Sequence, residues 1–197
     1  MIFSGTFYND SHWGINGDPY FLRDAWTNST IVYEGHSYDS IQVKYEINND
    51  LVIIKYVDKI GYEIPLQLDH TKIGEFWILG HHFVRIVADS SSTIKTGFFD
   101  VLYDGAEIKA LAKRQKTIKT TTELNQLVKE YLLIETYYIF SGRAYYPVKG
   151  KKSILEELSD RRNEIKAFMK KNRGRFKKDH ERQLIETVQY YDSIVNN

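Results

Sequence analysis

The side chains that come closest to a metal site are three histidines, His70, His81 and His82. A structural zinc site takes four ligands at fixed spacing, and no such spacing surrounds them. His81 and His82 are neighbours in an expected strand, where successive side chains point to opposite faces. His81 and His82 are therefore not expected to ligate the same ion. We predict no metal ligand and no bound cofactor, and we expect His12 to be a surface residue of a loop.

Residues for covalent or acid–base catalysis are equally sparse. The chain has no cysteine, which excludes thiol nucleophiles, disulfides and Cys-ligated zinc. No serine lies in a G-x-S-x-G motif, and H-E-x-x-H is absent. The glycines are scattered and none opens a helix after a strand, which argues against nucleotide binding. We predict no catalytic residue, and a hydrolase whose cleft leaves no local motif stays open as an alternative.

Aromatic side chains gather around a polar N-terminal loop, Asn9–Pro19. Exposed rings there could stack on sugars or peptides, which makes Trp13, Tyr20 and Trp26 the candidate ligand-binding residues. The alternative for Trp26 is burial in the core, because large aromatic side chains dominate burial. Trp13 lies inside the loop, where residues are usually at the surface.

A basic segment, Arg161–Arg182, carries a local charge of +7 in a chain of total charge +1, so the rest of the chain carries −6. Such a segment either contacts an anionic surface or is a solvated helix face that balances the acidic body. We do not expect nucleic acid as the partner. The candidate contacts with an anionic partner are Lys170, Lys171, Arg173, Arg175, Lys177 and Lys178.

The elements that must position these residues centre on Ile73–Arg114, which reads as four short strands. Asp104-Gly105 separates two hydrophobic runs, as in a hairpin with a type I′ turn. Strands before this stretch include Ser40–Ile47 and Leu51–Val57, which alternate apolar and polar residues. Glu130–Phe140 is β-branched and aromatic and predicts a further strand, whereas Lys116–Leu124 is polar and rich in Thr.

Helical periodicity begins after Gly150. Ser153 with Glu156 predicts a capping box, and Asp179 can cap the last helix. We therefore predict an α+β fold, in which an antiparallel β-meander forms a curved sheet or open barrel and two or three C-terminal helices follow. We expect residues 1–149 to form the β domain and residues 150–197 to pack on it as part of a single structural unit.

No apolar run is long enough for a transmembrane helix. The first residues lack the basic and apolar regions of a signal peptide. The sequence therefore leaves two expectations, a cytoplasmic protein or an exported one whose signal peptide has been removed.

The chain resembles a family of uncharacterised secreted or periplasmic proteins from Bacteroidetes. The resemblance covers nearly the whole chain and includes no catalytic motif. It rests on Gly17-Asp18-Pro19-Tyr20, Trp26, Tyr38, Val43-Lys44-Tyr45-Glu46-Ile47, Asp50-Leu51-Val52, Phe76, Phe83, Gly97-Phe98-Phe99, Leu102-Tyr103-Asp104-Gly105, Lys152-Ser153-Ile154-Leu155, Glu164-Ile165-Lys166 and Tyr190-Tyr191. It implies a periplasmic or secreted protein with no assigned activity. We expect a non-enzymatic envelope protein that binds or scaffolds a partner; the alternatives are a hydrolase with a cleft in the curved sheet and a carrier of a small apolar ligand.

Overall fold

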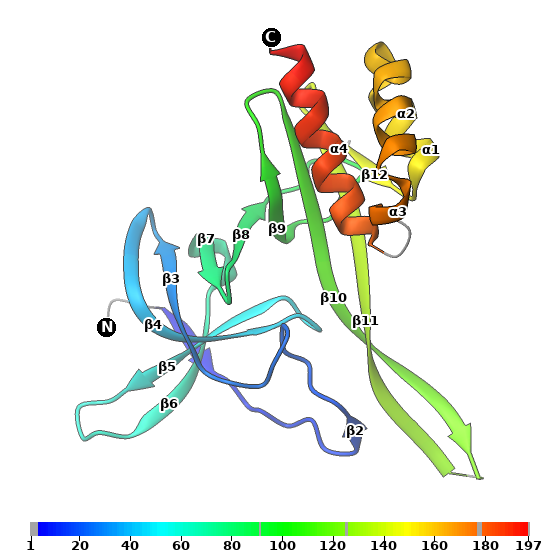
Figure 1. Ribbon diagram of the computed structural model, residues 1–197. Coiled ribbons are helices and arrows are strands. Elements are labelled where there is room, and N and C mark those ends of the chain that lie inside the picture. Colours follow the sequence, from blue (N-terminus) through cyan, green and yellow to red (C-terminus); the bar gives the residue numbers. More distant parts are fainter. Residues whose placement is uncertain (1–3, 91, 125, 177–178, 197) are drawn as a thin grey trace. The chain divides into compact units, whose positions relative to one another are not determined.

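The computed structural model describes residues 4–90, 92–124, 126–176 and 179–196 (Figure 1). It confirms the predicted α+β class. The strands form a mostly antiparallel meander in one sheet of 12 strands that does not close, and helices follow at the C-terminus.

The strands in chain order are β1 (Gly5–Phe7), β2 (Ile15–Asn16), β3 (Thr27–Tyr33), β4 (His36–Glu46), β5 (Leu51–Val57), β6 (Glu63–Leu68), β7 (Ile73–Ile78), β8 (His81–Ile86), β9 (Gly97–Asp104), β10 (Ile108–Glu123), β11 (Gln126–Ser141) and β12 (Ala144–Val148). The α-helices are α1 (Lys151–Glu157), α2 (Arg162–Lys171), α3 (Arg173–Phe176) and α4 (His180–Val195).

The order of strands across the sheet is β1-β6-β5-β4-β3-β7-β8-β9-β10-β11-β12. Most neighbours are joined by hairpins, as in a meander. Two pairings in this order join strands that are not consecutive in the chain: β1 pairs with β6, and β7 pairs with β3, so that Ile31 lies opposite Phe76. Outside this order, the short β2 pairs in parallel with β11.

The longest strands, β10 and β11, span 16 residues each and form one hairpin (green to yellow in Figure 1). The predicted strand Glu130–Phe140 is confirmed, but β11 begins earlier, and the Thr-rich stretch is also strand. Polar Thr and Lys side chains hide this strand from a search for buried alternation, because it is largely exposed there. Threonine is β-branched and suits an exposed strand.

The β9–β10 hairpin forms where Asp104-Gly105 predicts it, but not through a type I′ turn. Asp104 still belongs to β9 and pairs with Lys109. Neither Asp104 nor Gly105 has a positive φ. Glycine is needed here for close approach, because a Cβ on Gly105 would lie 2.6 Å from Asp192 Oδ2 and 2.7 Å from the Ile108 carbonyl oxygen.

The chain divides into two compact units. Unit 1 comprises residues 1–85 and 114–135, and unit 2 comprises residues 86–113 and 136–197. In unit 1, one face of the strands holds an aromatic core. The Tyr45 ring centre lies 5.1 Å from that of Phe76 and 4.9 Å from that of Phe83, which Phe21 meets edge-on at 5.0 Å.

Unit 2 packs its helices on strand residues through an aliphatic core that includes Ile108, Ile139, Ile165 and Val188. Of the two predicted helix caps, one is confirmed and the other is wrong. Asp179 caps α4, since its Oδ1 accepts from the backbone N–H of Arg182 at 2.8 Å. Ser153 is not the N-cap of α1: Gly150 holds that position, and Ser153 lies in the first turn and accepts from its backbone N–H at 3.2 Å.

Candidate functional site

The candidate site lies in unit 1, on the face of β4, β5 and β6 opposite the aromatic core. Alternation along β4 turns Tyr45 into the core and places Lys44 and Glu46 on the other face. Lys44 lies opposite Ile53 of β5, so Ile53 and Lys55 share that face. The sheet thus presents two lysines and a carboxylate around an isoleucine.

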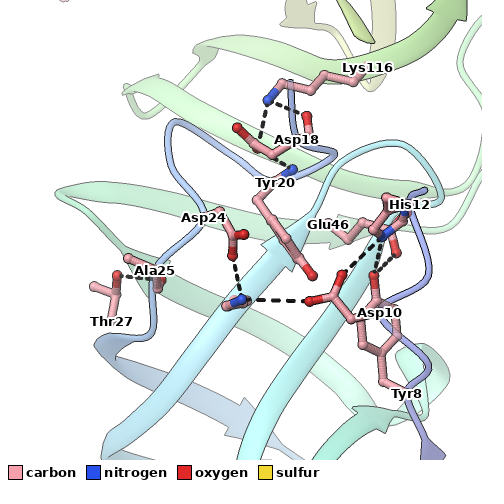
Figure 2. Close-up of polar contacts among 11 residues, drawn as sticks. Tyr8, Asp10, His12, Asp18, Tyr20, Asp24, Ala25, Thr27, Glu46 and Lys116 are labelled. Atoms are coloured by element: carbon pink, nitrogen blue, oxygen red, sulfur yellow. Dashed lines mark hydrogen bonds and ion pairs between the residues drawn. The ribbon is translucent and has the colours of Figure 1, made fainter. Parts of the chain in front are cut away.

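The N-terminal segment covers this face. The backbone N–H of Tyr8 donates to the Pro65 carbonyl at 2.9 Å, and Tyr20 forms an isolated bridge with Glu46. Lys116 holds the same segment from β10, because its Nζ lies 3.0 Å from Asp18 Oδ1 (Figure 2). The loop between Tyr8 and Tyr20 is therefore anchored at both ends.

Glu46 is a buried carboxylate, only 1% exposed. The Tyr8 hydroxyl donates to its Oε2 at 2.9 Å, and Asn49 Nδ2 donates to its Oε1 at 2.7 Å. Both oxygens thus have a donor, which offsets the cost of burying the group.

His12 lies between the hydroxyl groups of Tyr8 and Tyr131, and Figure 2 shows its contacts with Tyr8 and Asp10. Its Nε2 is 3.0 Å from the Tyr8 hydroxyl and 3.3 Å from Asp10 Oδ1, and its Nδ1 is 2.8 Å from the Tyr131 hydroxyl. Because Tyr8 gives its proton to Glu46, Nε2 is the donor in the contact with Tyr8. In a neutral ring, Nδ1 then accepts from Tyr131. His12 does lie in a loop, as expected, but it is a half-buried connecting residue and not a freely exposed one.

Two lysine ammonium groups lie over aromatic rings beside this network. Lys44 Nζ is 4.5 Å from the Tyr20 ring centre and 5.2 Å from that of Trp26, and Lys55 Nζ is 5.5 Å from Trp26. Each lysine also has a carboxylate partner: Asp24 for Lys44, and Glu63, at 2.9 Å, for Lys55.

These residues enclose a pocket of about 230 Å³, which we call the Tyr20 pocket. It is lined by Tyr8, Asp10, Tyr20, Trp26, Lys44, Ile53, Lys55, Glu63 and Pro65. The four charged residues in this lining balance, two of each sign. The apolar part consists of Trp26, Ile53 and Pro65.

The Tyr20 side chain is 1% exposed, and its hydroxyl makes no hydrogen bond of acceptable geometry within the described residues. Burial raises the pKa of Tyr20, and the Tyr8 hydroxyl and the Asp10 carboxylate raise it further. Burial is also the largest cause that raises the pKa of Tyr8. Both phenols are therefore neutral donors at physiological pH, and the Tyr20 hydroxyl, although it lies beside Tyr8 and Asp10, makes no hydrogen bond of acceptable geometry with either.

The three aromatic candidates separate in the structure. Tyr20 and Trp26 both line the Tyr20 pocket, which agrees with the ligand-binding interpretation without testing it. Trp13 is 91% exposed and is not among the lining residues.

The basic candidates lie at the end of α2 and in α3 of unit 2. Lys170, Lys171 and Arg173 are exposed. Arg175 is exposed too and contacts Glu186 Oε1 of α4 through its Nη2 at 2.7 Å. Lys177 and Lys178 fall outside the described residues.

The adjacent histidines do point to opposite faces of β8. His81 meets the Phe21 ring edge-on at 4.9 Å in the core, and His82 stacks on Trp77 with ring centres 4.3 Å apart. Among the described residues, no group of three His, Cys, Asp or Glu side chains is placed to hold a metal ion.

Sequence reasoning missed Tyr8, Lys44 and Lys55. The only signal for Lys44 was strand alternation, which usually means a solvated face. The covering loop that turns this face into a pocket leaves no trace in the strand sequence itself.

Across the described residues, no helix is both long and apolar enough to span a membrane. No protein-family model, no curated protein and no solved structure matches the chain.

Proposed function

We propose that the protein is a non-enzymatic binding protein whose ligand is a small polar molecule held in the Tyr20 pocket. The unpaired, buried hydroxyl of Tyr20 carries this proposal. Leaving a buried polar group without a partner costs about 1–3 kcal/mol. Such a group in a pocket wall is explained by a ligand that supplies the missing acceptor.

The lining defines the ligand. A pocket of about 230 Å³ lies below the usual range for drug-sized ligands, so the ligand is smaller, about the size of a free amino acid. Lys44, Lys55 and Tyr20 offer donors, and Asp10 and Glu63 offer acceptors. Because the charges balance, a molecule with both an anionic and a cationic group fits better than a simple ion. Its apolar part would lie against Trp26 and Ile53.

Binding fits this site better than hydrolysis. The lining holds no serine, threonine or histidine. Both lysine amines are already engaged by carboxylate partners, so neither is placed as a free nucleophile. Both ring nitrogens of His12 already contact tyrosine hydroxyls, which leaves neither available to move a proton to or from a substrate. The charged lining also suits a polar ligand better than an apolar one.

The test uses the indole N–H signals of the ¹⁵N-labelled protein. Free amino acids, dipeptides and monosaccharides are titrated one at a time. We expect a zwitterionic compound to shift the Trp26 indole signal saturably and to leave Trp13 unmoved. Tyr20→Phe removes one donor, worth about 0.5–1.5 kcal/mol, and should weaken binding roughly threefold to tenfold.

Trp13→Phe is the matched control, because it removes an exposed indole outside the pocket and should leave the affinity unchanged. Equal affinity in Trp26→Ala and the unaltered protein would place the ligand elsewhere. A panel that moves no Trp26 signal would contradict the proposal.

We further propose that the protein works in the cell envelope, on the basis of its resemblance to secreted and periplasmic proteins. Fractionation of the native host, followed by sequencing of the mature N-terminus, tests this. Recovery of the protein in the envelope or medium, with a leader removed, supports export, and recovery in the cytosol with the leader absent contradicts it.

A further inference from the structure

A second hollow in unit 1 carries an inference that does not depend on the Tyr20 pocket. It has a volume of about 320 Å³ and lies beside Trp77 at the β3, β4 and β7 strands. We call it the Trp77 groove. Its polar wall includes Asn28, Thr30 and Asp39.

The indole of Trp77 is a large apolar surface left partly open, 38% exposed. Its orientation is held by neighbours on the same sheet face. The His82 ring stacks parallel to it, with a ring-centre distance of 4.3 Å and an angle of 6° between the planes. His82 Nε2 is in turn 2.7 Å from Glu75 Oε2. The ring is therefore a preorganised surface, with one face covered by His82 and the rest of the ring available to the groove.

The polar side chains of the groove are also held in fixed positions by hydrogen bonds. Thr30 Oγ1 donates to Asp39 Oδ1 at 2.7 Å, and Gln42 Nε2 donates to Asn28 Oδ1. Thr30 lies directly opposite Trp77 in the β3–β7 pairing. A carboxylate and amide oxygens accept hydrogen bonds from hydroxyl groups, while the threonine hydroxyl and the amide can do either.

Two of the seven described non-glycine residues with a positive φ line this groove. Ser40 has φ 58° and Leu79 has φ 53°, and both line the groove. Residues other than glycine rarely adopt such values, and strained residues cluster at binding sites. The strained backbone lies on both sides of the groove, in the β3–β4 irregularity and in the β7–β8 turn.

We propose that the Trp77 groove binds a neutral carbohydrate chain. A pyranose ring has an apolar face of C–H groups, which suits an indole surface, and an edge of hydroxyl groups, which suits a row of Asp, Asn and Thr. The groove offers both: Thr30 lies one strand from Trp77, and Asp39 lies one strand beyond Thr30. A volume of about 320 Å³ accommodates at least one sugar unit, and the exposed sheet surface around it permits a longer chain.

Affinity electrophoresis tests the proposal. The protein migrates through gels that contain a soluble β-glucan, mannan, xylan or glycol chitin, and the hexasaccharide of the retarding polymer is then titrated against Trp fluorescence. We expect retardation by at least one polymer. Trp77→Ala should weaken hexasaccharide binding at least tenfold, and Asp39→Asn should weaken it severalfold.

Trp13→Ala is the matched control, since it removes another exposed indole, and it should leave retardation unchanged. Trp77→Phe keeps a ring beside His82 and should retain part of the affinity even where Trp77→Ala fails to fold. Failure of every polymer to retard the protein overturns the proposal, as does equal retardation of Trp77→Ala. Saturable binding of choline, with no sugar binding, would assign the groove to a cation instead.

Discussion

Tyr20 combines two properties that rarely occur together: nearly complete burial and a hydroxyl without a partner. Replacing it by phenylalanine removes the unpaired group and keeps the shape of the ring. We therefore expect Tyr20→Phe to raise the free energy of unfolding of the ligand-free protein by about 1 kcal/mol. Urea denaturation measures this. A loss of stability instead would show that the hydroxyl has a favourable contact in the folded protein.

The raised pKa values of Tyr8 and Tyr20 predict sensitivity to alkali. Unfolded tyrosines lose their protons near pH 10, while the two buried ones keep theirs. Above that pH the unfolded chain binds fewer protons than the folded one, so the free energy of unfolding falls as pH rises. Urea midpoints from about pH 8 to about pH 11 measure the fall, which begins at the ordinary tyrosine pKa.

Tyr20→Phe is the informative comparison for this effect. It should flatten the alkaline slope, because one of the two strongly shifted groups is gone. Identical slopes would mean that Tyr20 ionises in the folded state as it does in the unfolded chain.

The sequence allowed Tyr20 and Trp26 to be named as candidates because ring size and loop context are local properties. Lys44 and His12 could not be recognised in the same way. Their roles depend on partners far along the chain: Lys116 and Asp18 hold the covering loop, and Tyr131 contacts His12 across 119 positions. No pattern within a strand or loop encodes such pairs.

At the scale of the elements, the turn of the β7–β8 hairpin contains a leucine in a strained backbone conformation that a different residue would adopt more easily. Leu79 and Gly80 form its two-residue turn, with φ of 53° and 81°. Such turns favour Asn-Gly, whereas a leucine in this conformation costs about 1–2 kcal/mol. We expect Leu79→Asn to stabilise the protein by about 0.5–1 kcal/mol in urea denaturation. Leu79→Ala keeps the strained Cβ and should give no such gain; equal gains from both would remove the turn as the cause.

The basic end of α2 and α3 is the second element with a testable role. Arg175 and Arg182 both pair with Glu186, so part of the positive charge is balanced within unit 2. We therefore expect no retention on heparin at physiological salt, since exposed charges are screened there. Retention at that salt, lost in Lys170→Glu/Lys171→Glu, would instead establish an anionic partner. The double variant should fold normally because both side chains are exposed.

The sequence predicts correctly where the chain turns and where α1 begins, but it does not predict which interaction is responsible at either place. Asp104-Gly105 marks a real reversal, yet the glycine is required by the nearby Asp192 carboxylate, which the local sequence does not reveal. Ser153 sits near the start of α1, but Gly150 takes the cap. The Thr-rich part of β10 was missed because an exposed strand lacks the apolar alternation on which strand prediction depends.

At the scale of the whole molecule, neither of the two units is one continuous segment of the chain. The chain passes between units three times, and β10 and β11 belong to both. We therefore expect one cooperative unfolding transition. All three tryptophans lie in unit 1 and the α-helices lie in unit 2, so fluorescence and the helical circular dichroism signal report separately. Coincident curves would support cooperativity.

Ile165→Ala gives this prediction a sharper form. Ile165 is fully buried in unit 2, and truncation should cost about 2–5 kcal/mol. Both signals should then shift to lower urea by the same amount. Ile134→Ala, at a 42% exposed position, is the control and should have little effect. A shift of the dichroism curve alone would show that the units unfold independently.

The contact between His12 and Tyr131 also has a consequence for the time course of biosynthesis. Strands β3 to β8 can pair with one another as soon as they leave the ribosome, because their partners are nearby in the chain. The loop that covers Lys44 must wait for Lys116, 98 residues after Asp18, and for Tyr131. Closing loops of that length is slow compared with hairpin formation. The nascent protein therefore acquires the β3–β8 part of its sheet first and its pocket late, and a chain stalled before β11 lacks the contact between Tyr131 and His12.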